Sequence, residues 1–200
     1  MRQAGEEIQA GARTYVIEGT RGRGTFGTTY LARERTREAP LALKEIAIQD
    51  LGSWKTFELF EREVEALRRV DHPGIPRFED AFICQENRAV TRESATGAVS
   101  FVLVQELVRG VSLAERLKDC GALSMREAER LFASLLAIVD HLHRLAPPIV
   151  HRDIKPSNVI LDELDEAHLV DSARSAGLPE RATASARRWR APQASCPRSR

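Results

Sequence analysis

The sequence has few cysteines, no long hydrophobic run and almost no net charge. Its three cysteines, Cys84, Cys120 and Cys196, are odd in number and far apart, and their spacing fits neither a zinc site nor a disulfide framework. The formal net charge of +1 gives no argument for binding to nucleic acid or to a membrane surface. These absences favour a reducing compartment, so we expect a cytoplasmic protein without a nucleic-acid partner.

Membrane and export signals are also missing. The N-terminal residues lack the apolar core of a signal peptide, and the longest apolar region, residues 131–139, is too short to cross a bilayer. We therefore expect no membrane segment. A length of 200 residues, with 42% hydrophobic and 30% charged residues, suits one soluble domain or a small two-lobed unit.

The first half of the chain predicts a β-rich unit. Alternation of apolar and polar residues predicts five strands. They are expected after position 13 and over residues 28–33, 40–48, 77–84 and 100–107. Phe57, Phe60, Val64 and Leu67 recur at helical spacing and predict a helix over residues 53–70, capped by Ser53. Polar residues 1–12 predict a frayed lead-in.

The second half predicts helices followed by a pair of strands. A short helix is expected over residues 112–118 and a long, broadly apolar one over residues 124–145, where Ser124 and Glu127 form a capping box. Residues 159–162 and 167–171 predict the strand pair, and the Ala-, Arg- and Pro-rich tail predicts disorder. The expected divisions are residues 1–12, 13–106, 107–174 and 175–200.

A loop between the long helix and the next strand contains the segment His-Arg-Asp-Ile-Lys-Pro-Ser-Asn, residues 151–158. It combines a carboxylate base in Asp153, a cation in Lys155 and a metal-seeking amide in Asn158. These groups suit phosphoryl transfer, which needs positioning and charge neutralisation. The alternative is a polar surface loop that contains these residue types by coincidence.

Three glycines, Gly22, Gly24 and Gly27, lie between two predicted strands. In a dinucleotide-binding fold such a motif would open a helix, so a hairpin is expected instead. A glycine hairpin can fold over phosphates because its backbone amides are unhindered. The alternative is a flexible turn. Lys44, inside the third predicted strand, is either a phosphate ligand or an ordinary surface lysine.

Taken in this order, the motifs resemble those of a protein kinase of the bacterial serine/threonine type, over about residues 15–171. The resemblance implies an α+β, two-lobed fold with a five-stranded N-lobe, one N-lobe helix and an incomplete helical C-lobe. It also implies ATP and Mg²⁺ as cofactors and a serine or threonine hydroxyl of a protein as the substrate.

The resemblance assigns a role to each candidate residue. The glycines would cover the phosphates, and Lys44, held by Glu63, would neutralise the α- and β-phosphates. Adenine would lie against the backbone of Glu106 and Val108, next to a gatekeeper at Gln105. Asp153 would accept the proton of the substrate hydroxyl, and Lys155 would offset charge on the γ-phosphoryl group. Asn158 and Asp171 would hold Mg²⁺.

The sequence departs from the kinase pattern at three places. Thr29 replaces the usual Val after the glycines. Asp171 is followed by Ser172 and Ala173 instead of Phe-Gly, and no Ala-Pro-Glu motif follows. Loss of one base in a GC-rich gene would convert Asp-Phe-Gly-Ala-Arg into the observed Asp-Ser-Ala-Arg, which explains the departure as a truncating frameshift. The alternatives are a non-catalytic pseudokinase that binds nucleotide or a partner protein, and a small-molecule kinase.

Overall fold

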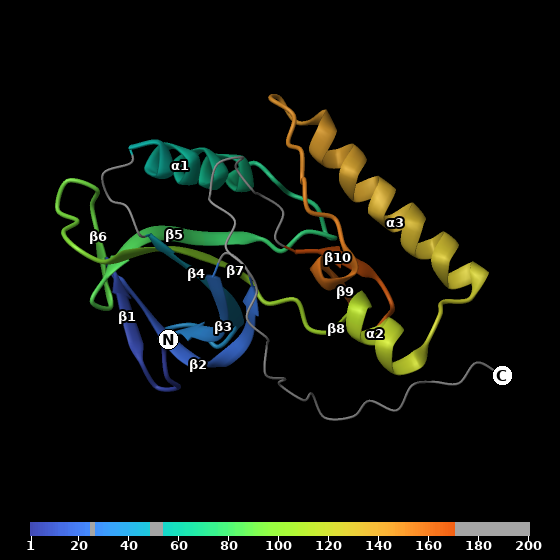
Figure 1. Ribbon diagram of the computed structural model, residues 1–200, viewed down its shortest axis with the longest axis horizontal. Coiled ribbons are helices and arrows are strands. Elements are labelled where there is room, and N and C mark those ends of the chain that lie inside the picture. The colour runs from blue at the N-terminus through green and yellow to red at the C-terminus, as the bar shows by residue number, and fades with distance from the viewer. Residues whose placement is uncertain (25–26, 49–53, 171–200) are drawn as a thin grey trace.

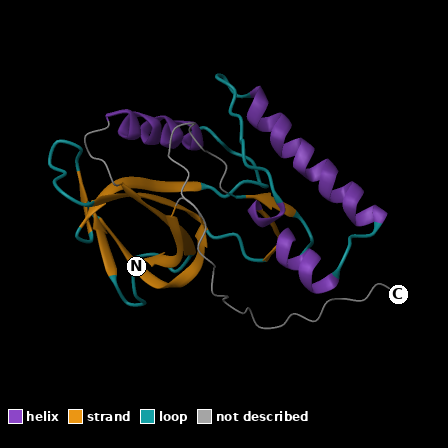
Figure 2. Ribbon diagram, in the orientation of Figure 1, coloured by secondary structure: helices purple, strands orange, loops and turns teal. Residues whose placement is uncertain are grey.

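The computed structural model describes residues 1–24, 27–48 and 54–170, arranged as a strand-rich lobe and a lobe richer in helix (Figure 1). Figure 2 shows that most of the strands gather in the first lobe, with α1 alongside them, while α2 and α3 belong to the second. The predicted α+β, two-lobed fold is confirmed.

Strands of the first lobe form a closed barrel in the order β1-β2-β3-β4-β7-β5-β6. Their bounds are β1 Glu7–Ala10, β2 Arg13–Gly24, β3 Gly27–Glu34, β4 Pro40–Ile48, β5 Phe78–Gln85, β6 Arg88–Val90 and β7 Val99–Glu106. The predicted five correspond to β2, β3, β4, β5 and β7. Alternate residues point into the barrel, where Tyr15, Tyr30, Leu43, Val102 and Val104 are fully buried.

Two further strands lie where the sequence predicted irregular chain. The expectation of a frayed lead-in is wrong, because β1 pairs with β2 and buries Ile8 completely. Strand β6 lies inside the predicted loop and touches β1 through the pairing of Gln9 with Arg88. Both strands are too short for their alternation to be recognised, and tertiary pairing defines them.

Helix α1, Trp54–Arg68, packs on the barrel through aromatic contacts. The ring of Phe60 stacks on Phe101 of β7 at 4.0 Å between centroids, and Phe57 meets the same ring edge-on at 5.3 Å. Val64 and Leu67 are buried, as the helical spacing predicted. The predicted cap, Ser53, lies outside the described residues.

In the second lobe, a three-stranded sheet of order β10-β9-β8 accompanies two α-helices. The bounds are β8 Val111–Ser112, α2 Leu113–Cys120, α3 Met125–Arg144, the 3-10 helix η1 Pro156–Asn158, β9 Val159–Leu161 and β10 Ala167–Leu169. Both α-helices begin with a capping box, at Ser112 with Glu115 and at Ser124 with Glu127. The predicted helices and strand pair are therefore confirmed.

Helix α3 is buried on one face alone. Ile138 and Leu142 lie in the core of the lobe, whereas Phe132 and Leu136 are 65% and 53% exposed. The broad apolar surface predicted for this helix is therefore only partly covered by the described residues. Among these residues, no helix combines the length and apolarity needed to cross a membrane.

The segment after α1 joins the two lobes. Ile75 is buried in the core of the second lobe, and the Leu169 amide donates to the Gly74 carbonyl at 2.7 Å. A Cβ at Gly74 would lie 2.6 Å from Ile138 Cδ1 and 3.1 Å from the Ala167 carbonyl, so the close approach requires glycine. This contact fixes where α1 lies relative to the second lobe.

Titration of His72 predicts a pH dependence of folding. Its ring lies 5.1 Å from that of His141, and its Nδ1 accepts a hydrogen bond from the Gly74 amide at 3.0 Å. Burial, with a smaller contribution from His141, lowers the pKa of His72 in the folded chain. The unfolded chain therefore binds the proton first, and stability is lost as pH falls below about 6.5.

The variant His72→Asn keeps an acceptor for the Gly74 amide and removes the titration. Thermal unfolding from about pH 7.5 to about pH 5.5 should lower the melting temperature more in the wild type than in His72→Asn. Equal losses in both proteins would show that His72 does not contribute.

Candidate active site

The loop between α3 and β9 brings together three of the candidate residues. Lys155 Nζ lies 2.9 Å from Asp153 Oδ2, and Asn158 Nδ2 donates to the same oxygen at 2.8 Å. Charge-assisted bonds of this length orient a carboxylate firmly. The carboxylate, ammonium and carboxamide thus form one compact polar cluster, as their spacing predicted.

Backbone bonds give the loop its shape. The His151 side chain is buried, and its Nδ1 accepts from the Asp153 amide at 3.3 Å. Arg152 between them has a φ of +65°, a left-handed conformation that a non-glycine residue adopts at a cost of ~1–2 kcal/mol. Such strain is found at functional sites where the surrounding structure enforces it.

Asn158 links this loop to the second lobe's sheet. The side chain is buried, its Nδ2 also donates to the Asp153 carbonyl at 2.9 Å, and its own carbonyl accepts from the Val170 amide at 2.9 Å. Val170 directly precedes Asp171, the other residue predicted to bind the metal. The chain just before Asp171 is therefore hydrogen-bonded to Asn158. Asp171 itself lies outside the described residues.

Lys44 lies on the face of β4 that α1 covers. Alternate residues of a strand share a face, so Lys44 points to the same side as Ile46 and Ile48. Those two isoleucines belong to one apolar cluster with Phe57 and Phe60 of α1. Lys44 is thus a strand residue whose side chain is directed toward α1.

Glu63 lies on the matching face of the helix. It follows Phe60 by three positions, which places the two side chains on one side of α1, and it is 9% exposed. A carboxylate so deeply buried requires a charged or hydrogen-bonding partner. The two candidates, Lys44 and Glu63, therefore lie on facing surfaces of the layer between α1 and the barrel.

The glycine motif forms the turn of the β2–β3 hairpin, with Gly24 paired to Gly27. A Cβ on Gly27 would lie 2.1 Å from the Glu45 carbonyl, so this position requires glycine. Gly22 and Gly24 are exposed, and a Cβ at Gly22 would meet nothing within 4 Å. Strand-turn-strand geometry excludes the helix-opening arrangement of a dinucleotide-binding fold.

The linker between the lobes follows β7. Gln105 is buried and its Nε2 donates to the Pro76 carbonyl at 3.4 Å, while the Glu106 amide donates to the Arg77 carbonyl at 2.9 Å. Glu106 and Val108 lie where the chain leaves the barrel, as the predicted contacts to a base require.

One residue at this site was not found from the sequence. Arg21 lies at a bulge in β2, where the pairing with β3 shifts register, and its guanidinium donates to the carbonyls of Val108 and Gly110 at 3.3 and 3.4 Å. Bulges near active sites redirect side chains in this way. Arg21 therefore ties the glycine hairpin to the linker, and only its place beside Gly22 could have indicated this.

The oxygen atoms of the loop fit a magnesium ion. Because Asn158 Nδ2 donates to Asp153, the carboxamide oxygen is an acceptor beside a carboxylate, contacted by the Ser157 hydroxyl at a long 3.5 Å. Hard oxygen ligands of this kind are those that Mg²⁺ prefers. Within the described residues, no group of three or more His, Cys, Asp or Glu side chains could hold a metal. Mg²⁺ in phosphoryl-transfer sites needs just one or two protein ligands, with phosphate and water completing the shell.

Comparison with known proteins identifies the family. The protein kinase domain model matches residues 15–194, so the chain belongs to the protein kinase family. The match extends past Asp171, into residues that the sequence predicted to be a disordered tail. Those residues lie outside the described part of the chain.

The curated relatives are kinases by name. Calcium-dependent protein kinase 4 of Arabidopsis thaliana is 30% identical over 78% of this chain and 28% of its own length. Myosin light chain kinase A of Dictyostelium discoideum is 32% identical over 78% of the chain and 48% of its own length. Calcium/calmodulin-dependent protein kinase type 1B of Homo sapiens is 34% identical over 73% of the chain and 38% of its own length. The chain thus spans less than half the length of these relatives, and the bacterial-type subclass stays a prediction.

Removal of the Asn158 carboxamide should destabilise the loop. Asn158→Ala breaks the bonds to the Asp153 carbonyl and carboxylate, and leaving these groups unpaired should lower the free energy of unfolding by about 1–3 kcal/mol. Chemical denaturation measures the loss. The variant Glu163→Ala, at an exposed side chain of the same lobe, should change stability by less than about 0.5 kcal/mol, and equal effects of both variants would contradict the linking role of Asn158.

Proposed function

We propose that the chain is the catalytic domain of a serine/threonine protein kinase, which transfers the γ-phosphoryl group of ATP to a protein hydroxyl. The observation that carries this proposal is the cluster of Asp153, Lys155 and Asn158 on one loop. A surface loop with these residue types by coincidence would not need a buried Asn158 that fixes the carboxylate.

Asp153 is proposed to orient the substrate hydroxyl and accept its proton as the oxygen attacks the γ-phosphorus. The bond from that phosphorus to the bridging oxygen of the leaving diphosphate breaks, and the electron pair stays on the diphosphate. Lys155, 2.9 Å from the Asp153 carboxylate, is placed to offset charge on the transferred group. MgATP supplies the electrophilic phosphorus when bound.

The remaining candidates are proposed to hold the nucleotide. Lys44, supported by Glu63, would neutralise the α- and β-phosphates below the hairpin of Gly22, Gly24 and Gly27. The backbone of Glu106 and Val108 would contact the base. Asn158, with Asp171, would bind Mg²⁺ through side-chain oxygens. A cytoplasmic location is proposed on the cysteine pattern alone.

A non-catalytic pseudokinase is the second candidate, favoured by one observation. Asp171 is followed by Ser172 and Ala173, so the apolar side chain and the glycine usual after the metal-binding Asp are both missing. Such a chain could bind nucleotide through its N-lobe without transferring phosphate.

Substitution in the catalytic cluster tests the proposal. Asp153→Ala and Lys44→Ala should each lower phosphotransfer from radiolabelled MgATP to a generic basic protein by at least about a hundredfold. Glu129→Ala, an exposed substitution on α3 away from the loop, is the matched control and should retain wild-type activity. Wild-type rates in the two site variants would refute the assignment. Stabilisation of the wild type by MgATP in a thermal-shift assay, without phosphotransfer, would favour the pseudokinase.

Arg21 should control nucleotide exchange. Arg21→Leu removes both bonds to the linker and frees the hairpin, so release of a fluorescent ATP analogue should be about two- to fivefold faster. This is the equivalent of ~0.5–1 kcal/mol for two long bonds, one partly buried and one exposed. Stopped-flow displacement measures the rate. Arg23→Leu, an exposed arginine on the same hairpin, should release nucleotide at the wild-type rate, and equal rates in both variants would contradict the tie.

A further inference from the structure

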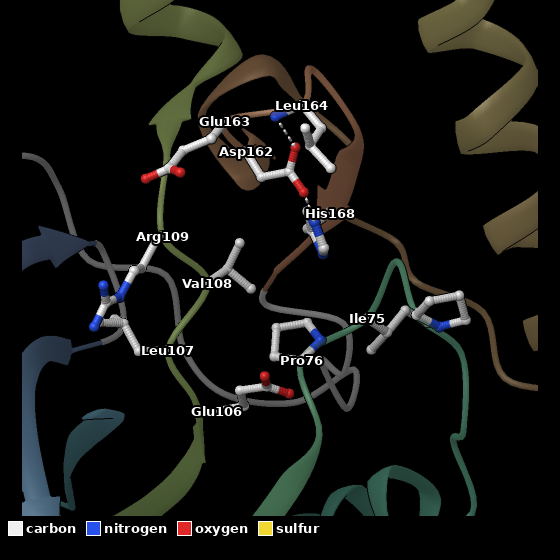
Figure 3. Close-up of a pocket in the computed structure, with 11 residues that line it drawn as sticks. Ile75, Pro76, Glu106, Leu107, Val108, Arg109, Asp162, Glu163, Leu164 and His168 are labelled. Atoms are coloured by element: carbon white, nitrogen blue, oxygen red, sulfur yellow. Dashed lines mark hydrogen bonds and ion pairs between the residues drawn. The ribbon is translucent and has the colours of Figure 1, made fainter. Parts of the chain in front are cut away.

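A cavity of about 380 Å³ lies behind the linker, but its charged groups are dispersed (Figure 3). It is enclosed by residues 73–76, residues 106–109 and the turn between β9 and β10. Figure 3 shows Arg109 and Glu163 directed away from its apolar centre, and Asp162 accepts hydrogen bonds from two amides of its own turn. Charged and polar groups instead converge at one end of the barrel, around the side chain of Arg2.

Arg2 places its guanidinium in a buried polar network at this end of the barrel. The side chain is 9% exposed, and its Nε and Nη2 donate to the two carboxylate oxygens of Glu45 at 3.1 and 2.7 Å. Nη1 donates to Glu6 Oε1 at 3.1 Å and to the Asn87 carboxamide oxygen. The Arg2 amide also donates to the hydroxyl of the buried Tyr30 at 3.2 Å. All three guanidinium nitrogens of Arg2 therefore have acceptors within this lobe.

A tight turn after Arg2 holds the side chain in this place. The Gln3 amide donates to Glu6 Oε2 at 3.0 Å, and the Glu6 amide donates to the Gln3 carbonyl at 3.1 Å. The Gly5 amide donates to the Ile17 carbonyl of β2 at 2.8 Å, and the Ile17 amide donates to the Glu6 carbonyl at 2.9 Å. The segment before β1 is thus fixed to β2, and Arg2 is directed toward the barrel.

Glu45 is the residue that the network holds. It follows Leu43, a fully buried barrel residue, by two positions, so its side chain points into the barrel. The Ser100 hydroxyl of β7 donates to Glu45 Oε1 at 2.7 Å, and Arg2 Nη2 lies 3.3 Å from Cys84 Sγ of β5. The Glu45 side chain is 18% exposed, and a carboxylate so far from water needs a charged partner. The two parallel bonds from Arg2 supply that partner and also fix the orientation of the carboxylate.

The Glu45 backbone contacts two parts of the proposed nucleotide site. Lys44 precedes it directly and points to the opposite side of β4, toward α1. A Cβ on Gly27 would lie 2.1 Å from the Glu45 carbonyl oxygen, so the glycine hairpin packs directly against this peptide group. A displacement of Glu45 would therefore move the lysine and the hairpin together. The linker proposed to contact the base lies at the far end of β7 from Ser100.

We propose that Arg2 is a positioning residue for the phosphate-binding groups: by holding the Glu45 carboxylate inside the barrel, it fixes the β4 backbone that carries Lys44 and supports Gly27. Arg2 acts through Glu45 and touches neither nucleotide nor substrate. The proposal rests on the proposed function, because Lys44 and the glycine hairpin are there assigned to ATP. Its consequence is selective, since Arg2 should affect a ligand that has phosphates and not one that lacks them.

The test compares the full wild-type chain with Arg2→Met, using MgATP and adenosine as probes in calorimetric titrations well below the melting temperature. Arg2→Met removes the two bonds to Glu45, so the Kd of MgATP should rise about tenfold. The Kd of adenosine, which has no phosphate, should stay within about twofold of the wild-type value. Arg2→Lys keeps the charge without the two parallel bonds, so it should retain the fold and raise the Kd of MgATP about threefold.

Asp80→Ala is the matched control, because it removes another polar contact of the barrel, the hydrogen bond from the Tyr15 hydroxyl at 2.8 Å, which does not involve Glu45. It should lower the melting temperature as Arg2→Met does, yet leave the Kd of each probe within about twofold of the wild-type value. An unchanged Kd of MgATP in Arg2→Met, or an equal rise for MgATP and adenosine, would overturn the proposal, because Arg2 would then only stabilise the barrel.

Hydrogen exchange separates this proposal from the proposed function, because it is measured without nucleotide. Arg2→Met should accelerate amide exchange over residues 27–29 and 44–46 by more than the loss of global stability explains, and Asp80→Ala should not. Faster exchange there, in a chain whose wild type binds no MgATP, would refute the proposed function while the coupling from Arg2 to the hairpin stands. Unchanged exchange would overturn the coupling itself.

Discussion

The hydrogen bonds of Asn158 hold the candidate site together. One carboxamide nitrogen donates to both the carbonyl and the carboxylate of Asp153, and the Asn158 carbonyl accepts from Val170 at the end of the strand pair. These bonds are made by a buried residue, where an unpaired polar group would cost ~1–3 kcal/mol. They fix the carboxylate that pairs with Lys155, and they direct the amide nitrogen away from the side on which the proposed metal ligand, the Asn158 amide oxygen, lies. The positions of the proposed base and of the proposed metal ligand thus depend on one side chain.

The junction of the lobes sets the rest of the geometry. The Gly74 carbonyl accepts from Leu169, Ile75 enters the second-lobe core, and Arg69 donates to the Ala146 carbonyl at 2.7 Å, shortly before the loop that carries Asp153. These contacts follow directly after α1, which carries Glu63 toward the β4 face of Lys44. A few contacts at one junction therefore set the position of the proposed phosphate-binding layer relative to the proposed catalytic loop. Arg21 adds a second connection, because its guanidinium donates from the glycine hairpin to two carbonyls of the linker.

Short local patterns in the sequence were enough to predict several helices and strands and the cluster of polar residues around Asp153. Ser124 and Glu127 mark the start of α3 because a capping box needs just four consecutive residues, and Lys155 and Asn158 are close to Asp153 because one short loop holds all three. Strand β1 was missed because a single buried residue, Ile8, defines it through pairing with Tyr15. Arg21 was missed because its direction depends on a bulge. The cavity combines three segments distant in the chain, so no local pattern could indicate it.

The central claim is that these residues form a metal-dependent nucleotide site in this chain, whatever follows Asp171. Calorimetric titration of the full chain with ATP, in the presence and in the absence of Mg²⁺, tests it most directly. The account predicts one binding site, with affinity that falls when Mg²⁺ is removed and is lost in Lys44→Ala. Absence of binding, or binding of equal affinity with and without Mg²⁺ in both proteins, would contradict it.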